Sequence, residues 1–95
     1  MKCDNTLFSS HAITRMFDRE LSKSDVIEAI RNGETLSDYP DDQPYPSKLL
    51  LGIIKEKPIH IVVARNKISY SCYVITAYSP SLKLWHADFK TRKQQ

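Results

Sequence analysis

The sequence has few of the residues that mark several common protein classes. It contains two glycines, two cysteines and one tryptophan in 95 residues. Two glycines leave no glycine-rich phosphate loop, and two cysteines are too few for a disulfide-stapled scaffold. The longest apolar runs are far shorter than the roughly 20 residues that cross a bilayer, so no membrane segment is expected. No basic stretch followed by an apolar run opens the chain, which predicts a cytoplasmic location without a secretory signal.

The remaining composition is typical of one small globular domain. Hydrophobic residues make up 41% and charged residues 26% of the chain, which argues against disorder. Cys72 lies in an apolar segment, where we predict a buried free thiol, with a redox or nucleophilic role as the alternative. No cofactor is expected. No metal is expected either, because the histidines and cysteines lack zinc-like spacing and the aspartates at 38, 41 and 42 lack the calcium-loop pattern.

The charges are divided unevenly along the chain. Residues 18–42 hold eight acids against three bases, whereas residues 65–95 hold six bases against one acid. Such a division is compatible with a polyanion on the basic surface, and with self-association or a basic partner on the acidic one. The alternative is that both halves are simply solvated.

Two helices are predicted within about residues 10–32. The first begins after Ser9 or Ser10 and ends near Glu20. The second begins at Ser22, which is a suitable N-cap, and ends before Gly33, for which we predict a left-handed backbone. The predicted apolar stripe of the first helix consists of Ala12, Ile13, Met16 and Phe17.

Strand patterns fill the rest of the chain, at about residues 34–39, 48–55, 59–65 and 68–78, and a basic tail follows at 83–95. Three prolines between residues 40 and 46 predict a loop. Short connections between the later strands predict antiparallel neighbours. The predicted fold is therefore α+β, a single domain over residues 1–95 with two N-terminal helices packed on an antiparallel sheet of three to four strands.

Three nitrogen-rich side chains follow one another at a spacing of four residues in the first helix. His11, Arg15 and Arg19 fall within roughly 80° of one another around the helix axis, away from Ile13 and Phe17. A row of this kind is a candidate phosphate-binding surface. A solvated face, in which Asp18 pairs with Arg15, is the alternative.

Polar side chains interrupt two of the predicted strands. His60 stands in an otherwise apolar run, where an imidazole needs a hydrogen-bond partner, so it is either a functional or a structural histidine. Thr76 and Tyr78 share one face of the last strand and are candidate ligand contacts. The tyrosines of this strand equally suit a half-buried sheet surface.

Basic side chains near the end of the chain are candidates for holding a polyanion. Lys90, Arg92 and Lys93 lie in the tail, and Arg65 and Lys67 lie in or beside a predicted hairpin turn. A merely solubilising tail is the alternative.

Taken together, several short motifs resemble those of a bacterial family of small domains of unknown function, over most of the chain. The motifs are Ser10-His11-Ala12-x-x-Arg15-Met16-x-x-Arg19, Asp25-Val26-Ile27, Asn32-Gly33-Glu34, Tyr39-Pro40-Asp41-Asp42, Leu49-Leu50-Leu51-Gly52, Pro58-Ile59-His60-Ile61-Val62 and Ile75-Thr76-Ala77-Tyr78-x-Pro80. That family looks distantly similar to RelE- and BrnT-like toxins of toxin–antitoxin pairs. The resemblance implies a RelE-like fold, RNA as the partner (mRNA in particular) and a zinc-finger or helix-turn-helix antitoxin.

The expected function is that of a metal-independent endoribonuclease toxin, in which the 2′-hydroxyl attacks the adjacent phosphorus. His11 and His60 are the candidate acid and base, because imidazole titrates near neutral pH. Arg15 and Arg19 are the expected cations for the transition state, and Thr76 or Tyr78 positions the phosphate. Two further hypotheses remain: a non-catalytic module that binds RNA or protein, and a toxin held inactive by its antitoxin. The oligomeric state is not indicated.

Overall fold

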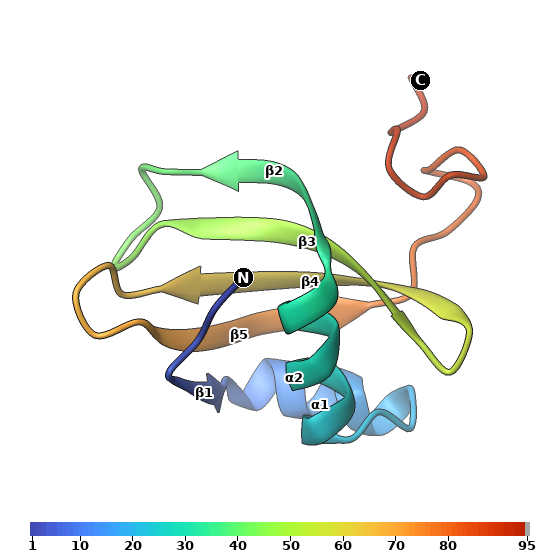
Figure 1. Cartoon of the computed structure of the whole chain (residues 1–95). Helices are drawn as coiled ribbons and strands as arrows, with labels where there is room; N and C mark the ends of the chain where they lie inside the picture. The colour runs from blue at the N-terminus through green and yellow to red at the C-terminus, as the bar shows by residue number, and fades with distance from the viewer. Residues whose placement is uncertain (95) are drawn as a thin grey trace.

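A computed structural model, which describes residues 1–94, shows two helices and one five-stranded sheet (Figure 1). The elements are β1 (Asn5–Phe8), α1 (Ser10–Asp18), α2 (Lys23–Asn32), β2 (Glu34–Tyr39), β3 (Ser47–Ile54), β4 (Lys57–Arg65) and β5 (Ser71–Tyr78). The strand order is β1-β5-β4-β3-β2. β1 runs parallel to β5, and the other three neighbouring pairs are antiparallel.

The predicted sheet of three to four antiparallel strands after two N-terminal helices is wrong, although the α+β class is confirmed. A strand precedes the helices, and the sheet is mixed and has five strands. The sequence does not reveal β1, because four residues are too few for an alternating pattern to stand out. Asn5 of β1 pairs with Ser71 of β5. The pairing of these two strands therefore depends on the whole intervening chain rather than on a local turn.

Both helices begin at serine caps. The Ser9 side chain accepts a hydrogen bond from the Ala12 amide, and Ser22 forms a reciprocal capping box with Asp25. The predicted apolar stripe of α1 is only partly confirmed: Ala12 and Met16 are buried, whereas Ile13 and Phe17 are exposed, Phe17 at 84%.

Gly33 is not left-handed, which corrects the prediction. Its φ of −70° and ψ of 156° are extended, because the chain passes directly from α2 into β2. A Cβ at Gly33 would lie 2.6 Å from the Ala29 carbonyl oxygen of α2 and 3.2 Å from the Leu51 carbonyl oxygen of β3, and a Cβ at Gly52 would lie 2.7 Å from the Ala29 Cβ. Both glycines therefore serve the close packing of α2 on β3.

The core lies between the two helices and one face of the sheet. Figure 1 shows α1 beside β5 and α2 crossing the strands. The buried cluster unites residues of α1 and α2 with alternate residues of β3, β4 and β5: Ala12, Met16, Val26, Ala29, Ile30, Leu50, Ile54, Ile59, Ile61, Val63, Cys72, Val74 and Ala77. On the opposite face, Tyr45 of the proline-rich loop stacks on Tyr73 at 5.4 Å.

Cys72 is not a free thiol, which corrects the prediction: it forms a disulfide with Cys3. The parallel pairing of β1 with β5 brings these two residues together although they are 69 positions apart. Among residues 1–94, no helix is both long enough and apolar enough to cross a membrane.

Candidate functional site

The cationic row of α1, which we define as His11 and Arg15 of the helix together with Arg19 at its C-cap, lies at the protein surface. All three side chains are exposed. No ion pair involving Arg15 or Arg19 is found within residues 1–94, so the predicted alternative of an Arg15–Asp18 pair is not observed there. Two guanidinium groups are therefore available to an anion.

The start of α1 is fixed on β5 by hydrogen bonds. The Ser9 amide donates to the Val74 carbonyl at 3.0 Å, and the Ser9 hydroxyl donates to the Ile75 carbonyl at 2.9 Å. A register shift between β4 and β5 leaves Ile75 without a cross-strand partner at this point. The His11 Nε2 then lies 3.0 Å from the Thr76 hydroxyl oxygen. The cationic row is therefore anchored beside the part of β5 that extends beyond β1.

His60 is completely buried on the sheet face opposite the helices. Its Nε2 lies 2.7 Å from the Phe89 carbonyl oxygen, and its Nδ1 lies 3.2 Å from the Tyr78 hydroxyl. Because a carbonyl only accepts, Nε2 carries the proton, and Nδ1 of the neutral ring accepts from Tyr78. Burial lowers the pKa of His60 despite the opposing hydrogen bond to Phe89, which keeps the ring neutral near pH 7.

Aromatic rings surround this imidazole. Trp85, only 7% exposed, meets the His60 ring edge-on at 4.5 Å between centroids, and the Arg92 guanidinium lies 5.7 Å from the Trp85 ring centre. Tyr78 also contacts His60 edge-on, and burial raises the pKa of its phenol. The predicted alternative of a satisfied structural histidine therefore describes the geometry of His60.

The two histidine clusters meet on β5. Thr76 pairs with Val62, and Tyr78 pairs with His60, so Thr76 and Tyr78 face the same side of the sheet. Two positions along a strand correspond to about 6.6 Å. The structure thus brings His11 of α1 and His60 of β4 into contact with two nearby residues of β5, Thr76 and Tyr78, with one ring exposed and the other buried.

The other predicted basic residues are dispersed. Arg65 lies at the opposite end of β4 from His60, donates to the Lys2 carbonyl and stacks over a tyrosine ring. Lys90 pairs with Glu34 at 3.1 Å, Arg92 lies over the tryptophan, and Lys93 is half-buried. Of the predicted RNA contacts, only Thr76 directly touches the cationic row.

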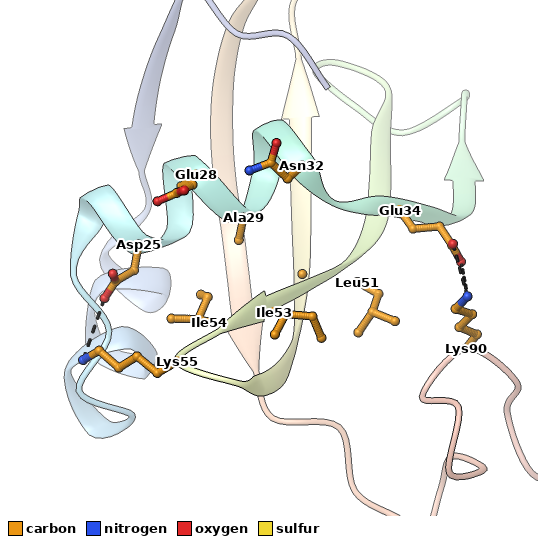
Figure 2. A pocket seen from close by; sticks show the side chains of 11 residues that line it. Asp25, Glu28, Ala29, Asn32, Glu34, Leu51, Ile53, Ile54, Lys55 and Lys90 are labelled. Atoms are coloured by element: carbon orange, nitrogen blue, oxygen red, sulfur yellow. Dashed lines mark hydrogen bonds and ion pairs between the residues drawn. The ribbon is translucent and has the colours of Figure 1, made fainter.

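A groove of about 630 Å³ between α2 and β3 was not predicted (Figure 2). Figure 2 shows one ion pair at each end of the groove, Lys55 with Asp25 and Lys90 with Glu34. Apolar side chains, including Ile53, lie between the two pairs. Hydrogen bonds from Ser22 lower the pKa of Asp25. The sequence shows the acids of α2 and the apolar Ile53. It does not show that α2 crosses this end of β3, so the groove could not be predicted.

These features define a small mixed-sheet α+β domain in which His11, Arg15 and Arg19 form an exposed row along α1 and its C-cap. Residues 8–79 match the family described as a domain of unknown function (DUF4258), and the chain belongs to this family. The predicted membership of an uncharacterised small-domain family is thereby confirmed. No curated protein and no solved structure matches the chain.

Proposed function

We propose that this protein binds single-stranded RNA through the cationic row of α1. The observation that carries the proposal is the exposure of Arg15 and Arg19 in line with His11, with no ion pair to either arginine among the described residues. Positions four residues apart in a helix lie about 6 Å apart along its axis, so an RNA backbone that follows α1 to its C-cap meets His11, Arg15 and Arg19 in turn. Guanidinium groups suit this role because they bind phosphate bidentately.

A binding measurement with a charge-matched control tests this proposal. Arg15→Gln and Arg19→Gln should each weaken binding of a labelled single-stranded RNA and reduce the salt slope by about one counterion. Arg31→Gln removes the same charge from an exposed position at the end of α2 and should have little effect. Equal losses in all three variants would show that the row is not the binding surface.

Metal-independent RNA cleavage is a second candidate, which the exposed His11–Thr76 pair favours. In this reaction the 2′-hydroxyl loses its proton to a base and attacks phosphorus, and the 5′-oxygen leaves with a proton from an acid. The products are a 2′,3′-cyclic phosphate and a 5′-hydroxyl. His11 is the accessible group for proton transfer, and Arg15 stabilises the crowded phosphorane. His60 is given no part in proton transfer, because in the free protein both of its ring nitrogens are hydrogen-bonded.

The cleavage candidate is tested with purified protein in the presence of a chelator. Wild type should generate cyclic-phosphate ends, and His11→Ala should reduce the rate by about 10²-fold or more while RNA binding persists. If binding is retained and neither protein yields product, the domain is a non-catalytic RNA-binding module.

If the protein cleaves RNA, its more specific role is that of a toxin. It draws on the resemblance to RelE- and BrnT-like toxins, and it adds a zinc-finger or helix-turn-helix antitoxin as partner and the cytoplasm as location. Expression should then arrest growth, His11→Ala should relieve the arrest, and co-expression of the product of the neighbouring gene should do the same. Unimpaired growth during accumulation of folded wild-type protein would contradict the role.

A further inference from the structure

Residues 80–94, which we call the C-terminal cover, lie over His60 on the sheet face opposite the helices. Figure 1 shows this segment leaving the end of β5 and rising at that end of the sheet. The family match ends at residue 79, so the cover lies outside the region that the chain shares with its family. The buried state of His60 therefore depends on a segment outside the matched domain.

The cover is a self-contained unit. In the described residues, the hydrogen bonds that its backbone makes to other backbone groups all join two residues of the cover, such as Trp85 to Ser81 and Lys93 to Leu84. Two polar contacts connect it to the rest of the domain: the Phe89 carbonyl with His60, and the Lys90–Glu34 ion pair. It can therefore move off the sheet without breaking any strand pairing.

The cover presents two chemical groups to His60. One is the aromatic ring of Trp85, which meets the imidazole edge-on, and the other is the carbonyl oxygen of Phe89, which accepts the Nε2 proton. A nucleobase with an exocyclic carbonyl offers the same two groups on one ring. Uracil, cytosine and guanine carry such an oxygen, whereas adenine does not. Proteins recognise bases of single-stranded RNA by contacts with aromatic rings and by hydrogen bonds to base edges, and the hydrogen bond is the contact that a base carbonyl would reproduce at His60.

We propose that His60 and Tyr78 form a binding site for a carbonyl-bearing nucleobase, which the C-terminal cover occupies in the free protein and RNA vacates by displacing it. This inference rests on the proposed RNA binding, because Thr76 connects the cationic row to Tyr78 along β5. The phosphates lie on α1, and one base reaches across the edge of β5 to the Nε2 donor of His60. Free protein then binds RNA more weakly than protein with a loosened cover.

The single tryptophan provides the measurement, since Trp85 is the only one in the chain and is buried under these contacts. Full-length protein is titrated with oligouridine and with oligoadenosine, and binding is followed separately by the anisotropy of a labelled strand. At saturation with oligouridine, Trp85 emission should shift to the red and become accessible to acrylamide. Oligoadenosine should bind the cationic row and leave Trp85 protected.

A matched pair of variants supplies the second arm. Glu34→Gln removes the partner of Lys90, and Glu28→Gln removes an equal charge from an exposed position of α2 that forms no ion pair within residues 1–94. Glu34→Gln should raise oligouridine affinity about two- to fivefold over Glu28→Gln, because the ion pair it breaks is exposed and weak.

The outcomes separate the two proposals. If both oligonucleotides bind while Trp85 stays protected, or both expose it equally, the base site is wrong and RNA binding stands. Equal affinities of the two variants would likewise show that the cover does not compete with RNA. Absence of binding by either strand overturns the proposed function and this inference together.

Discussion

The surroundings of His11 and His60 differ sharply although both residues contact β5. His11 is exposed and has one hydrogen-bond partner, the Thr76 hydroxyl. His60 has no accessible surface, and the Tyr78 hydroxyl and the Phe89 carbonyl occupy both of its ring nitrogens. An exposed imidazole is free to meet a substrate, whereas a buried and satisfied one contributes to stability. In the free protein, two positions along one strand therefore separate an exposed histidine from a buried, hydrogen-bonded one.

The covalent framework reinforces this separation. The Cys3–Cys72 disulfide connects the segment before β1 to β5, and the Ser9 hydrogen bonds then set the start of α1. The cationic row is thus held on a rigid support. The C-terminal cover, by contrast, contacts the sheet through side chains and one carbonyl. Because of this difference, we expect substitution of His60 to affect the stability of the protein and substitution of His11 to leave it nearly unchanged.

The largest expected effect comes from truncating the two histidines. His60→Ala leaves a cavity and removes the partners of Tyr78 and Phe89, so it should lower the free energy of unfolding by about 2–4 kcal/mol. His11→Ala changes an exposed side chain and should alter that free energy by less than about 0.5 kcal/mol. Urea unfolding at neutral pH measures both values. Similar losses of unfolding free energy in the two variants would show that His11 and His60 contribute equally to stability.

The pH dependence of stability should sharpen the same distinction. Burial lowers the pKa of His60 in the folded state, so below about pH 6.5 the unfolded chain binds more protons than the folded one. The contribution of His60 to stability is thus complete above this pH and decreases as the pH falls through it. Wild type should lose stability between about pH 7 and pH 5, and His60→Gln should lose less. Parallel curves for the two proteins would assign the loss to other groups.

The sequence predicts the parts of this fold that depend on local signals. The cap at Ser22 follows from residue type and spacing, and short connections predict the antiparallel pairing of β3, β4 and β5. β1 and the disulfide were not predicted, because both depend on residues far apart in the sequence.

The candidate site divides in the same way. The row of His11, Arg15 and Arg19 could be predicted, because helical spacing alone places these residues together. The burial of His60 could not, because an apolar strand is compatible with either an open or a covered face. What decides it is a contact with Phe89, 29 residues later in the chain. No local pattern carries that information.

The smallest expected effect separates the two hydroxyl partners on β5. Thr76→Val removes the partner of an exposed imidazole at similar side-chain volume and should change the unfolding free energy by less than about 0.5 kcal/mol. Tyr78→Phe leaves the buried Nδ1 of His60 without a donor and should cost about 1–2 kcal/mol. Denaturant titration at pH 7 measures the unfolding free energies of the two variants. A more damaging Thr76→Val would mean that the start of α1, rather than the histidine cluster, is the part of the domain on which stability depends.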